Sequence, residues 1–257
     1  MRDMLHGREY DRFRETEEGS GMIRANTRGR LTAADLQLVI LLLSRGSAHR
    51  RAYLERRLAA EGPDALLDSP DLLERLLTVR TMLVPSEALF FFVVVRHALR
   101  GAGVDDPVLS DYLAALLLEF GQRDRAWRVD WNDDQRHRYL VDILVDLESS
   151  SGERRFRVML HLGNYALWLA GLFPDYIAAR HLRKGGPAVT YYDEWGRRGF
   201  GMASDHSLAT QYGLDTVLRT AASRFPSVRT ALNGVSDRLL FPSGQSPDRI
   251  LRDLGAH

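Results

Sequence analysis

The sequence predicts an all-α protein with a single main domain of bundle-like or orthogonally packed helices. Three observations lead to this prediction. Apolar residues recur at the i, i+3, i+4, i+7 spacing of an amphipathic helix in most segments of the 257-residue chain. Short runs containing Gly, Pro or Ser separate these segments. No segment alternates apolar and polar residues as a strand with one solvated face does.

The first 30 residues differ in composition from the rest of the chain. They contain 13 charged residues and few aliphatic ones, so they can bury little apolar area. We expect residues 1–30 to form a polar, mobile N-terminal arm, or one that becomes ordered only against a partner. The helical domain then occupies residues 31–257, with a candidate subdivision near residues 121–132, where a polar segment interrupts the helices.

Start and stop signals mark the first helices of this domain. Thr32, with Asp35 three residues later, resembles a capping box, and Gly46 suits the position after a helix end. An amphipathic helix covers residues 48–62. Ser69 precedes a proline and predicts the start of another helix.

The segment PSEALFFFVVVRHALRGAG, residues 85–103, is the one ambiguous element. Its FFFVVV run favours a strand. The whole unit of about 15 residues is long for a strand, and Ser86 and Gly101 are placed as helix start and stop signals. We therefore predict a buried helix here, followed by another helix between Asp106 and Gly121.

Four further expectations concern the second half of the chain. Asn132 and Gln135 have the spacing of a capping box and predict a helix that extends through Glu148. A short helix follows at residues 174–184. The aromatic and Gly-rich residues 188–204 predict one or two helical turns followed by an irregular loop, and Asp205 is the expected N-cap of the next helix.

Residues 158–173, VMLHLGNYALWLAGLF, form the most distinctive segment. A helix that is apolar on every face is buried, so we predict a core helix over residues 153–172. The apolar run is too short for a membrane span, which needs about 20 predominantly apolar residues. His161, Asn164, Tyr165 and Trp168 are spaced to lie on one side of this helix.

A buried imidazole or carboxamide loses about 1–3 kcal/mol when it has no hydrogen-bond partner. Partners for His161 and Asn164 must therefore come from other helices. The candidates, in decreasing order, are Glu119 and Glu194, then Asp111, Tyr112 and Asn233.

Two interpretations of the polar pair remain open. In the first, His161 and Asn164 are hydrogen-bonded core residues that fix the register of the helix. In the second, they are catalytic together with Glu119 and Glu194, and His161 acts as a general base or a metal ligand. Candidate ligand-binding residues around such a site are Tyr165, Trp168, Tyr191, Tyr192, Arg197 and Arg198.

Several chemistries lack their sequence motifs. The chain has no cysteine, so it cannot form disulfides or use a thiolate. No HExxH or Glu-x-x-His metal motif, no phosphate-binding loop and no G-x-S-x-G motif occurs. The sequence therefore assigns no metal site and specifies no cofactor. GRRGFG at 196–201 has no preceding strand and predicts a turn with glycines at positive φ, rather than a dinucleotide fingerprint.

Charge and the N-terminal residues bear on location and partners. The net charge of +1 gives no long-range attraction to nucleic acid or to an anionic membrane, although a local basic patch is compatible with it. The charged N-terminus has no apolar core of a secretory signal. These features predict a soluble, cytoplasmic protein.

The leading functional expectation is a non-catalytic helical module that binds a protein partner, a second copy of itself or a ligand. The first alternative is an enzyme or metal-binding protein built around His161 and Asn164. The second is a nucleic-acid binder that uses the arginines and tryptophans of residues 123–138. Interleaved aspartates cancel the charge of that segment and favour a loop that docks its tryptophans on the core.

Overall fold

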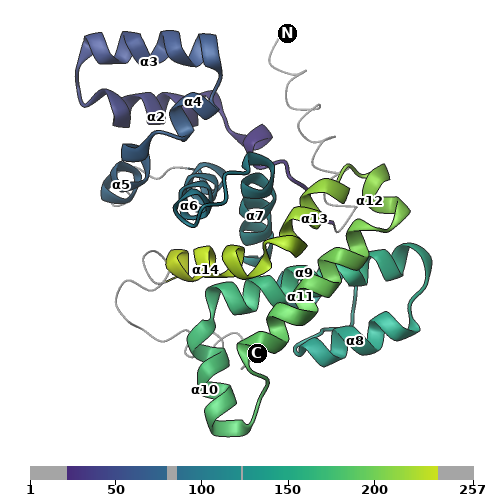
Figure 1. The fold of residues 1–257 in the computed structure, drawn as a ribbon. Coiled ribbons are helices and arrows are strands. Elements are labelled where there is room, and N and C mark those ends of the chain that lie inside the picture. Colours follow the sequence, from purple (N-terminus) through teal and green to yellow (C-terminus); the bar gives the residue numbers. More distant parts are fainter. Residues whose placement is uncertain (1–21, 80–85, 123, 237–257) are drawn as a thin grey trace.

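The computed structural model describes residues 22–79, 86–122 and 124–236, and these residues form thirteen α-helices, two short 3-10 helices and no strand (Figure 1). The predicted all-α class is therefore confirmed. In chain order the elements are η1 (Arg28–Arg30), α2 (Ala33–Ser44), α3 (Ala48–Glu61), α4 (Asp64–Leu67), α5 (Pro70–Val79), α6 (Glu87–Gly101), α7 (Pro107–Phe120), η2 (Arg125–Trp127), α8 (Leu140–Ser149), α9 (Gly152–Leu172), α10 (Pro174–Lys184), α11 (Val189–Ser204), α12 (Ser207–Gln211), α13 (Asp215–Ser223) and α14 (Phe225–Val235).

Helix α9 is the centre of the fold. Every residue from Val158 to Leu172 is buried, which confirms the expectation of a core helix. Helix α11 packs along α9, and α7, α8, α10 and α14 also contact it. Figure 1 shows α2 and α3 side by side at one end of the molecule, while α8 and α10 lie at the other end.

Helix α11 differs from the sequence-based expectation. We expected at most two helical turns followed by a loop, but one helix continues through all of the glycines, none of which has a positive φ. The reason is the close approach of α9. A Cβ atom on Gly199 would lie 2.6 Å from the backbone nitrogen of Gly163, and one on Gly163 would lie 2.6 Å from the Phe200 ring. The glycines therefore serve helix packing, not a turn.

Polar side chains of α14 and its C-cap donate hydrogen bonds to the last carbonyl groups of α9. The last carbonyls of a helix have no partner within the helix. Asn233 Nδ2 donates to the carbonyl oxygens of Ala170 and Gly171 at 2.9 and 2.7 Å, and Ser236 Oγ donates to that of Leu172 at 2.7 Å. These bonds fix α14 against the helix that carries the polar pair.

The start signals predicted for the first half are confirmed. Thr32 and Asp35 form a reciprocal capping box on α2. The ambiguous FFFVVV run is helical and lies in α6, whose N-cap is Ser86. Burial explains its apolar composition, and the one buried charge of this helix, Arg96, is paired with Asp68 through two hydrogen bonds of 2.8 and 2.7 Å.

Two predicted helix starts are wrong. The helix expected from Asn132 begins only at Leu140, because aspartates hold the intervening backbone in turns. Asp133 accepts a hydrogen bond from the backbone nitrogen of Asp130 at 3.0 Å, and Asp130 accepts one from that of Asn132 at 3.2 Å. Such side-chain contacts compete with helical hydrogen bonds.

The second wrong start concerns the N-cap of α12. We expected Asp205 in this position, but His206 occupies it, and its Nδ1 accepts from the backbone nitrogen of Leu208 at 3.2 Å. Asp205 instead lies at the end of α11. Helix α11 extends to Ser204, so Asp205 is its C-cap and the N-cap of α12 is the next residue, His206.

Residues 22–30 are the described part of the expected arm, and they pack against the domain. The side chain of Thr27 donates to the carbonyl oxygen of Asp111 at 3.1 Å, and the backbone nitrogen of Arg28 donates to its carboxylate at 2.6 Å. Residues 1–21 lie outside the described part. Contacts of α6 with α14, and of α7 with α13, connect elements on both sides of residues 121–132.

Candidate functional site

The polar pair of α9 lies in the protein core. Asn164 is 2% exposed, and its Oδ1 accepts a hydrogen bond of 2.8 Å from the hydroxyl of Tyr112 on α7. Burial raises the pKa of Tyr112 well above its usual value, so the hydroxyl remains a donor. Tyr112 was only a secondary candidate in the sequence, and it is the partner that the structure assigns.

His161 is also buried, between the rings of Phe120 and Tyr165. Its Nε2 has no hydrogen-bond partner among the described residues. Burial, and then the positive charge of Arg125, hold the pKa of His161 well below its usual value. A small cavity of about 10 Å³ adjoins His161 and Asn164, which is room for about one water molecule. This cavity is far smaller than the usual small-molecule site.

Neither expected carboxylate is brought to the pair. Glu194 is exposed on α11 and forms an i,i+4 ion pair of 2.6 Å with Arg198. Glu119, near the end of α7, lies 3.6 Å from Nε of the buried Arg125. The described residues contain no group of three or more His, Asp or Glu side chains placed to hold a metal ion.

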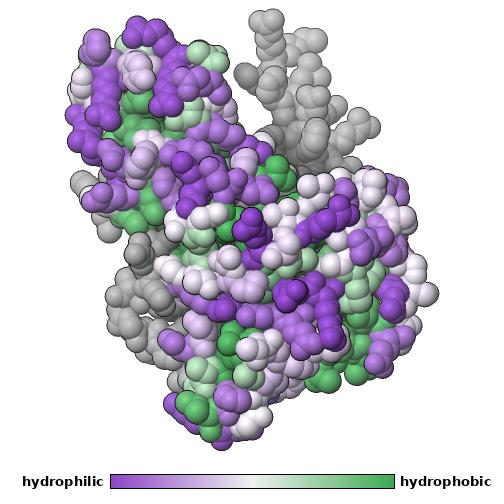
Figure 2. Space-filling model, in the orientation of Figure 1, coloured by the Kyte–Doolittle hydropathy of each residue, from purple (hydrophilic) through white to green (hydrophobic). Residues whose placement is uncertain are grey.

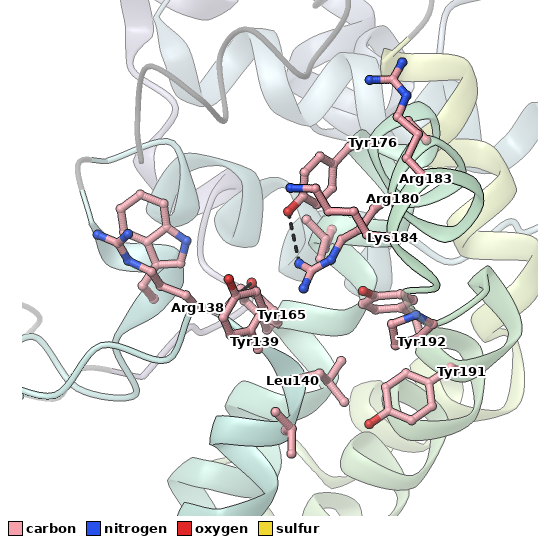
Figure 3. Close-up of a pocket in the computed structure, with 15 residues that line it drawn as sticks. Arg138, Tyr139, Leu140, Tyr165, Tyr176, Arg180, Arg183, Lys184, Tyr191 and Tyr192 are labelled. Carbon is pink, nitrogen blue, oxygen red and sulfur yellow. Dashed lines mark hydrogen bonds between the residues drawn. The ribbon is translucent and has the colours of Figure 1, made fainter. Parts of the chain in front are cut away.

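A much larger pocket, of about 700 Å³, opens on another side of α9 (Figure 3). It lies between the first turn of α8, the C-terminal half of α9, one face of α10 and the first turn of α11. Its described lining is Trp127, Arg138, Tyr139, Leu140, Val141, Tyr165, Leu169, Tyr176, Ala179, Arg180, Arg183, Lys184, Pro187, Tyr191 and Tyr192. Five tyrosines and four cations belong to this set, and it includes no carboxylate.

Helix α10 supplies most of the positive charge. Pro174 begins the helix, and Gly185, with φ of 62°, ends it. Tyr176, Arg180 and Arg183 follow one another at i, i+4, i+7 and therefore share the face that lines the pocket. Beyond Gly185, the chain returns through Pro187 to α11, whose first turn carries Tyr191 and Tyr192.

The guanidinium of Arg180 lies centrally among the tyrosines in Figure 3. It sits 4.6 Å from the ring centroid of Tyr139, and its Nη1 donates to the hydroxyl of Tyr176 at 3.2 Å. Both of these partners are neutral. No carboxylate pairs with this side chain in the described part of the chain. The pocket therefore holds a partly buried charge without a counter-ion.

Tyr165 and Tyr192 form a buried wall of the pocket. Burial raises the pKa of both hydroxyls, so both are protonated at neutral pH. The Tyr165 hydroxyl donates to the carbonyl oxygen of Arg138 at 2.7 Å. Tyr192 has no hydrogen-bond partner among the described residues. Its hydroxyl is therefore available to a ligand.

The pocket includes some of the residues that the sequence singled out as ligand-binding. Tyr165, Tyr191 and Tyr192 line it. Trp168 packs instead on Phe120 and Phe173 in the core. The remaining two candidates, Arg197 and Arg198, are exposed further along α11, and the guanidinium of Arg198 lies 5.0 Å from the centroid of the Trp195 ring.

Sequence reasoning missed the cations of the pocket. The sequence indicates Arg138 only as part of the candidate nucleic-acid segment, residues 123–138, and does not single out Arg180, Arg183 or Lys184. The i, i+4, i+7 spacing of Tyr176, Arg180 and Arg183 was the available signal. Such a spacing defines a helix face, but it does not say whether the face meets solvent or a cavity.

In the segment 124–138, Arg136 and Arg138 are exposed and Trp131 is half-buried, but other residues of the candidate nucleic-acid platform are not accessible. Arg125 and Trp127 are buried. Arg128 donates to the backbone carbonyls of Trp131 and Asp133 at 3.3 and 3.0 Å. Stacking on bases needs exposed rings, whereas this segment directs its first tryptophan into the core. Residue 123 lies outside the described part.

Comparison of the chain with protein-family models found no match, and neither curated proteins nor solved structures yielded one. Among the described residues, no helix has both the length and the apolar character needed to cross a membrane. The fold and the pocket thus define an all-helical protein with a tyrosine- and arginine-lined cavity.

Proposed function

We propose that this protein is a ligand-binding module whose large pocket takes a small molecule with an anionic group and an apolar or aromatic body. The observation that carries the proposal is the set of four cations, Arg138, Arg180, Arg183 and Lys184, in a described lining that has no carboxylate. A concentrated positive charge attracts anions, and an arginine binds phosphate or carboxylate through two parallel hydrogen bonds.

The contrast with other arginines of the protein supports this proposal. Several half-buried arginines have an acidic partner, whereas Arg75 and Arg128 donate to backbone carbonyls. Arg154 contacts the carboxylates of Asp133 and Asp146 at 2.7 and 2.6 Å, and Arg229 contacts that of Asp193 at 2.8 Å. Arg180 has only aromatic and hydroxyl partners, so an anionic ligand would supply the missing negative charge.

Size and wall chemistry define the rest of the ligand. A volume of about 700 Å³ is within the range of small-molecule sites. Tyr139, Tyr191 and Tyr192 offer ring faces, and Leu140 and Leu169 offer aliphatic surface. A purely inorganic anion would leave these walls uncovered, so a ligand with an apolar or aromatic body fits better.

Binding is favoured over catalysis by the composition of the same walls. The described lining contains no His, Ser, Thr, Cys, Asp or Glu, so it lacks the nucleophile–base pairs of hydrolytic enzymes. The competing catalytic hypothesis at His161 receives no support from a cavity of about 10 Å³.

Calorimetric titration with phenyl phosphate tests the proposal, with phenol as the neutral analogue. We expect binding of phenyl phosphate only, weakened at least about tenfold by Arg180→Gln, because a hydrogen bond to a charged group contributes about 1.5–3 kcal/mol. Arg56→Gln, at an exposed position of α3, is the matched control and should bind as the wild type does. Equal affinity of the wild type and Arg180→Gln would contradict the proposal.

A further inference from the structure

Exposed apolar side chains lie on the helices that bound the pocket, and two of them, Tyr139 and Val141, line it. The large apolar side chains that are exposed in the described part of the chain are Leu41, Tyr53, Val108, Tyr139, Val141, Val145 and Leu182. Four of these seven belong to α8, its N-cap or α10, the elements that bound the pocket, and Leu182 is 83% exposed. Figure 2 shows apolar surface at the end of the molecule where α8 and α10 lie.

The same end of the molecule carries unpaired positive charge. Arg138, Arg183 and Lys184 are exposed and line the pocket. No carboxylate within ion-pair distance of them is found among the described residues. Exposed aliphatic side chains, cations and tyrosines together are the composition of a surface that lies in a lipid headgroup region.

Among the described residues, the acidic side chains of α8 and α10 form no ion pair with these exposed cations. Asp142 accepts a hydrogen bond from the backbone nitrogen of Tyr139, and Asp146 is paired with His137 and Arg154. Glu148 and Asp175 are exposed. Glu148 lies in the last turn of α8, and Asp175 lies in the first turn of α10. The exposed pocket residues come from the other end of each helix, around the first turn of α8 and in the last turn of α10.

We infer that this face docks on an anionic membrane surface, and that the pocket receives the anionic headgroup of a lipid. The inference rests on the proposed function, because it names the source of the anion bound by Arg180. The headgroup phosphate would meet Arg180 and the exposed cations, while Val141, Val145 and Leu182 would enter the boundary between headgroups and acyl chains.

A second copy of the chain fits this face less well. In a two-fold symmetric contact the same patch meets itself, so the cations at the mouth would face one another. An anionic bilayer has the opposite charge, and each cation near its surface contributes about 1 kcal/mol to binding. Charge complementarity therefore favours the lipid surface.

Vesicle flotation of the full chain tests the inference. The vesicles consist of phosphatidylcholine with or without phosphatidylglycerol. The wild type should float only with phosphatidylglycerol, and salt should weaken its binding. The combined variant Val141→Ser, Val145→Ser, Leu182→Ser should lose binding at least about tenfold, since each buried aliphatic side chain contributes on the order of 1 kcal/mol.

The matched control replaces exposed apolar residues elsewhere. Leu41→Ser with Val108→Ser, on α2 and α7, should float as the wild type does. Arg180→Gln should reduce flotation. Circular dichroism and thermal unfolding establish that each variant is folded. The double variant Val145→Ser, Leu182→Ser, whose positions lie outside the pocket lining, should bind vesicles more weakly than the wild type and retain phenyl phosphate binding.

The possible failures are distinguishable. Binding of phenyl phosphate without any vesicle binding would overturn the membrane inference and leave the proposed pocket intact. Flotation that is equal with neutral vesicles, or unchanged in the triple variant, would also overturn it. If the wild type self-associates but does not float, and the triple variant no longer self-associates, the face is a protein contact and the membrane inference is wrong. If the wild type bound neither phenyl phosphate nor vesicles, both the proposed pocket and the membrane site would be refuted.

Discussion

The hydroxyl of Tyr112 on α7 donates a 2.8 Å hydrogen bond to Oδ1 of Asn164 on α9, and both side chains are buried. This bond joins two core helices through a buried polar contact. It gives Asn164 a structural role, because a buried carboxamide without its partner would destabilise the folded state.

The first prediction concerns this bond. Tyr112→Phe leaves Oδ1 of Asn164 buried without its donor, so we expect the free energy of unfolding to fall by about 1–3 kcal/mol. Chemical denaturation measures this change. In a double-mutant cycle, Asn164→Leu should lower the free energy of unfolding less in the Tyr112→Phe background than in the wild type. Additive effects of the two substitutions would show that the bond does not couple the helices.

The second prediction concerns the packing of α11 on α9. A Cβ atom on Gly199 would lie 2.6 Å from the backbone nitrogen of Gly163, which cannot rotate away. Gly199→Ala should therefore destabilise the protein by about 1–3 kcal/mol, the usual cost of overpacking. Thermal unfolding measures the effect.

Gly201 offers a matched control on the same helix. A Cβ atom there meets nothing within 4 Å, and alanine is favoured over glycine in a helix interior by about 1 kcal/mol. Gly201→Ala should leave stability unchanged or raise it slightly. If both substitutions had the same effect, close helix approach would not explain the glycines.

The third prediction concerns acid sensitivity. Burial, followed by the charge of Arg125, lowers the pKa of His161 in the folded state. Below the unfolded-state pKa of about 6.5 the unfolded chain therefore binds more protons at this residue than the folded chain does. Stability should fall as the pH decreases from about 6.5 to 5, by up to about 1.4 kcal/mol per pH unit for this group.

His161→Phe removes this contribution. The variant should show a shallower loss of unfolding free energy over the same pH interval, whatever its stability at neutral pH. Leu41→Ser on α2, an exposed position without a titratable group, should leave the slope as it is. A wild-type slope retained by His161→Phe would argue against a buried neutral imidazole.

The sequence predicted the helical class and the core well, because both follow from local patterns. The capping box of Thr32 and Asp35 needs only residues of one helix turn, and the apolar faces of α9 need only one segment. The helical state of FFFVVV in α6 followed from its length and flanking signals. These features depend little on the rest of the fold.

The two larger errors have a different cause, since both involve contacts between distant segments. The glycines of α11 look like a loop until Gly163 of α9 is placed against them. The side chains of Asp130 and Asp133 hold the turns that delay α8, and they also pair with Arg157 and Arg154 of α9. The helix propensity of a single segment gives no information about these interactions.

The candidate site was predicted only in part for the same reason. The identity of His161 and Asn164 as a buried pair on one helix was readable from the sequence. Their partners were not, because candidates on α7, α11 and α14 were all compatible with the pattern. The pocket needs α8, α9, α10 and α11 to converge, so the role of Arg180 emerges only when these helices are assembled.

The fourth prediction is a bound structure, which tests the proposed pocket most directly. Crystals of the full chain soaked with 4-bromophenyl phosphate should show the bromine anomalous signal inside the pocket, near Tyr191 and Tyr192. The phosphate should lie within hydrogen-bond distance of the Arg180 guanidinium. An empty pocket at saturating ligand, or a ligand bound only elsewhere on the molecule, would contradict the account.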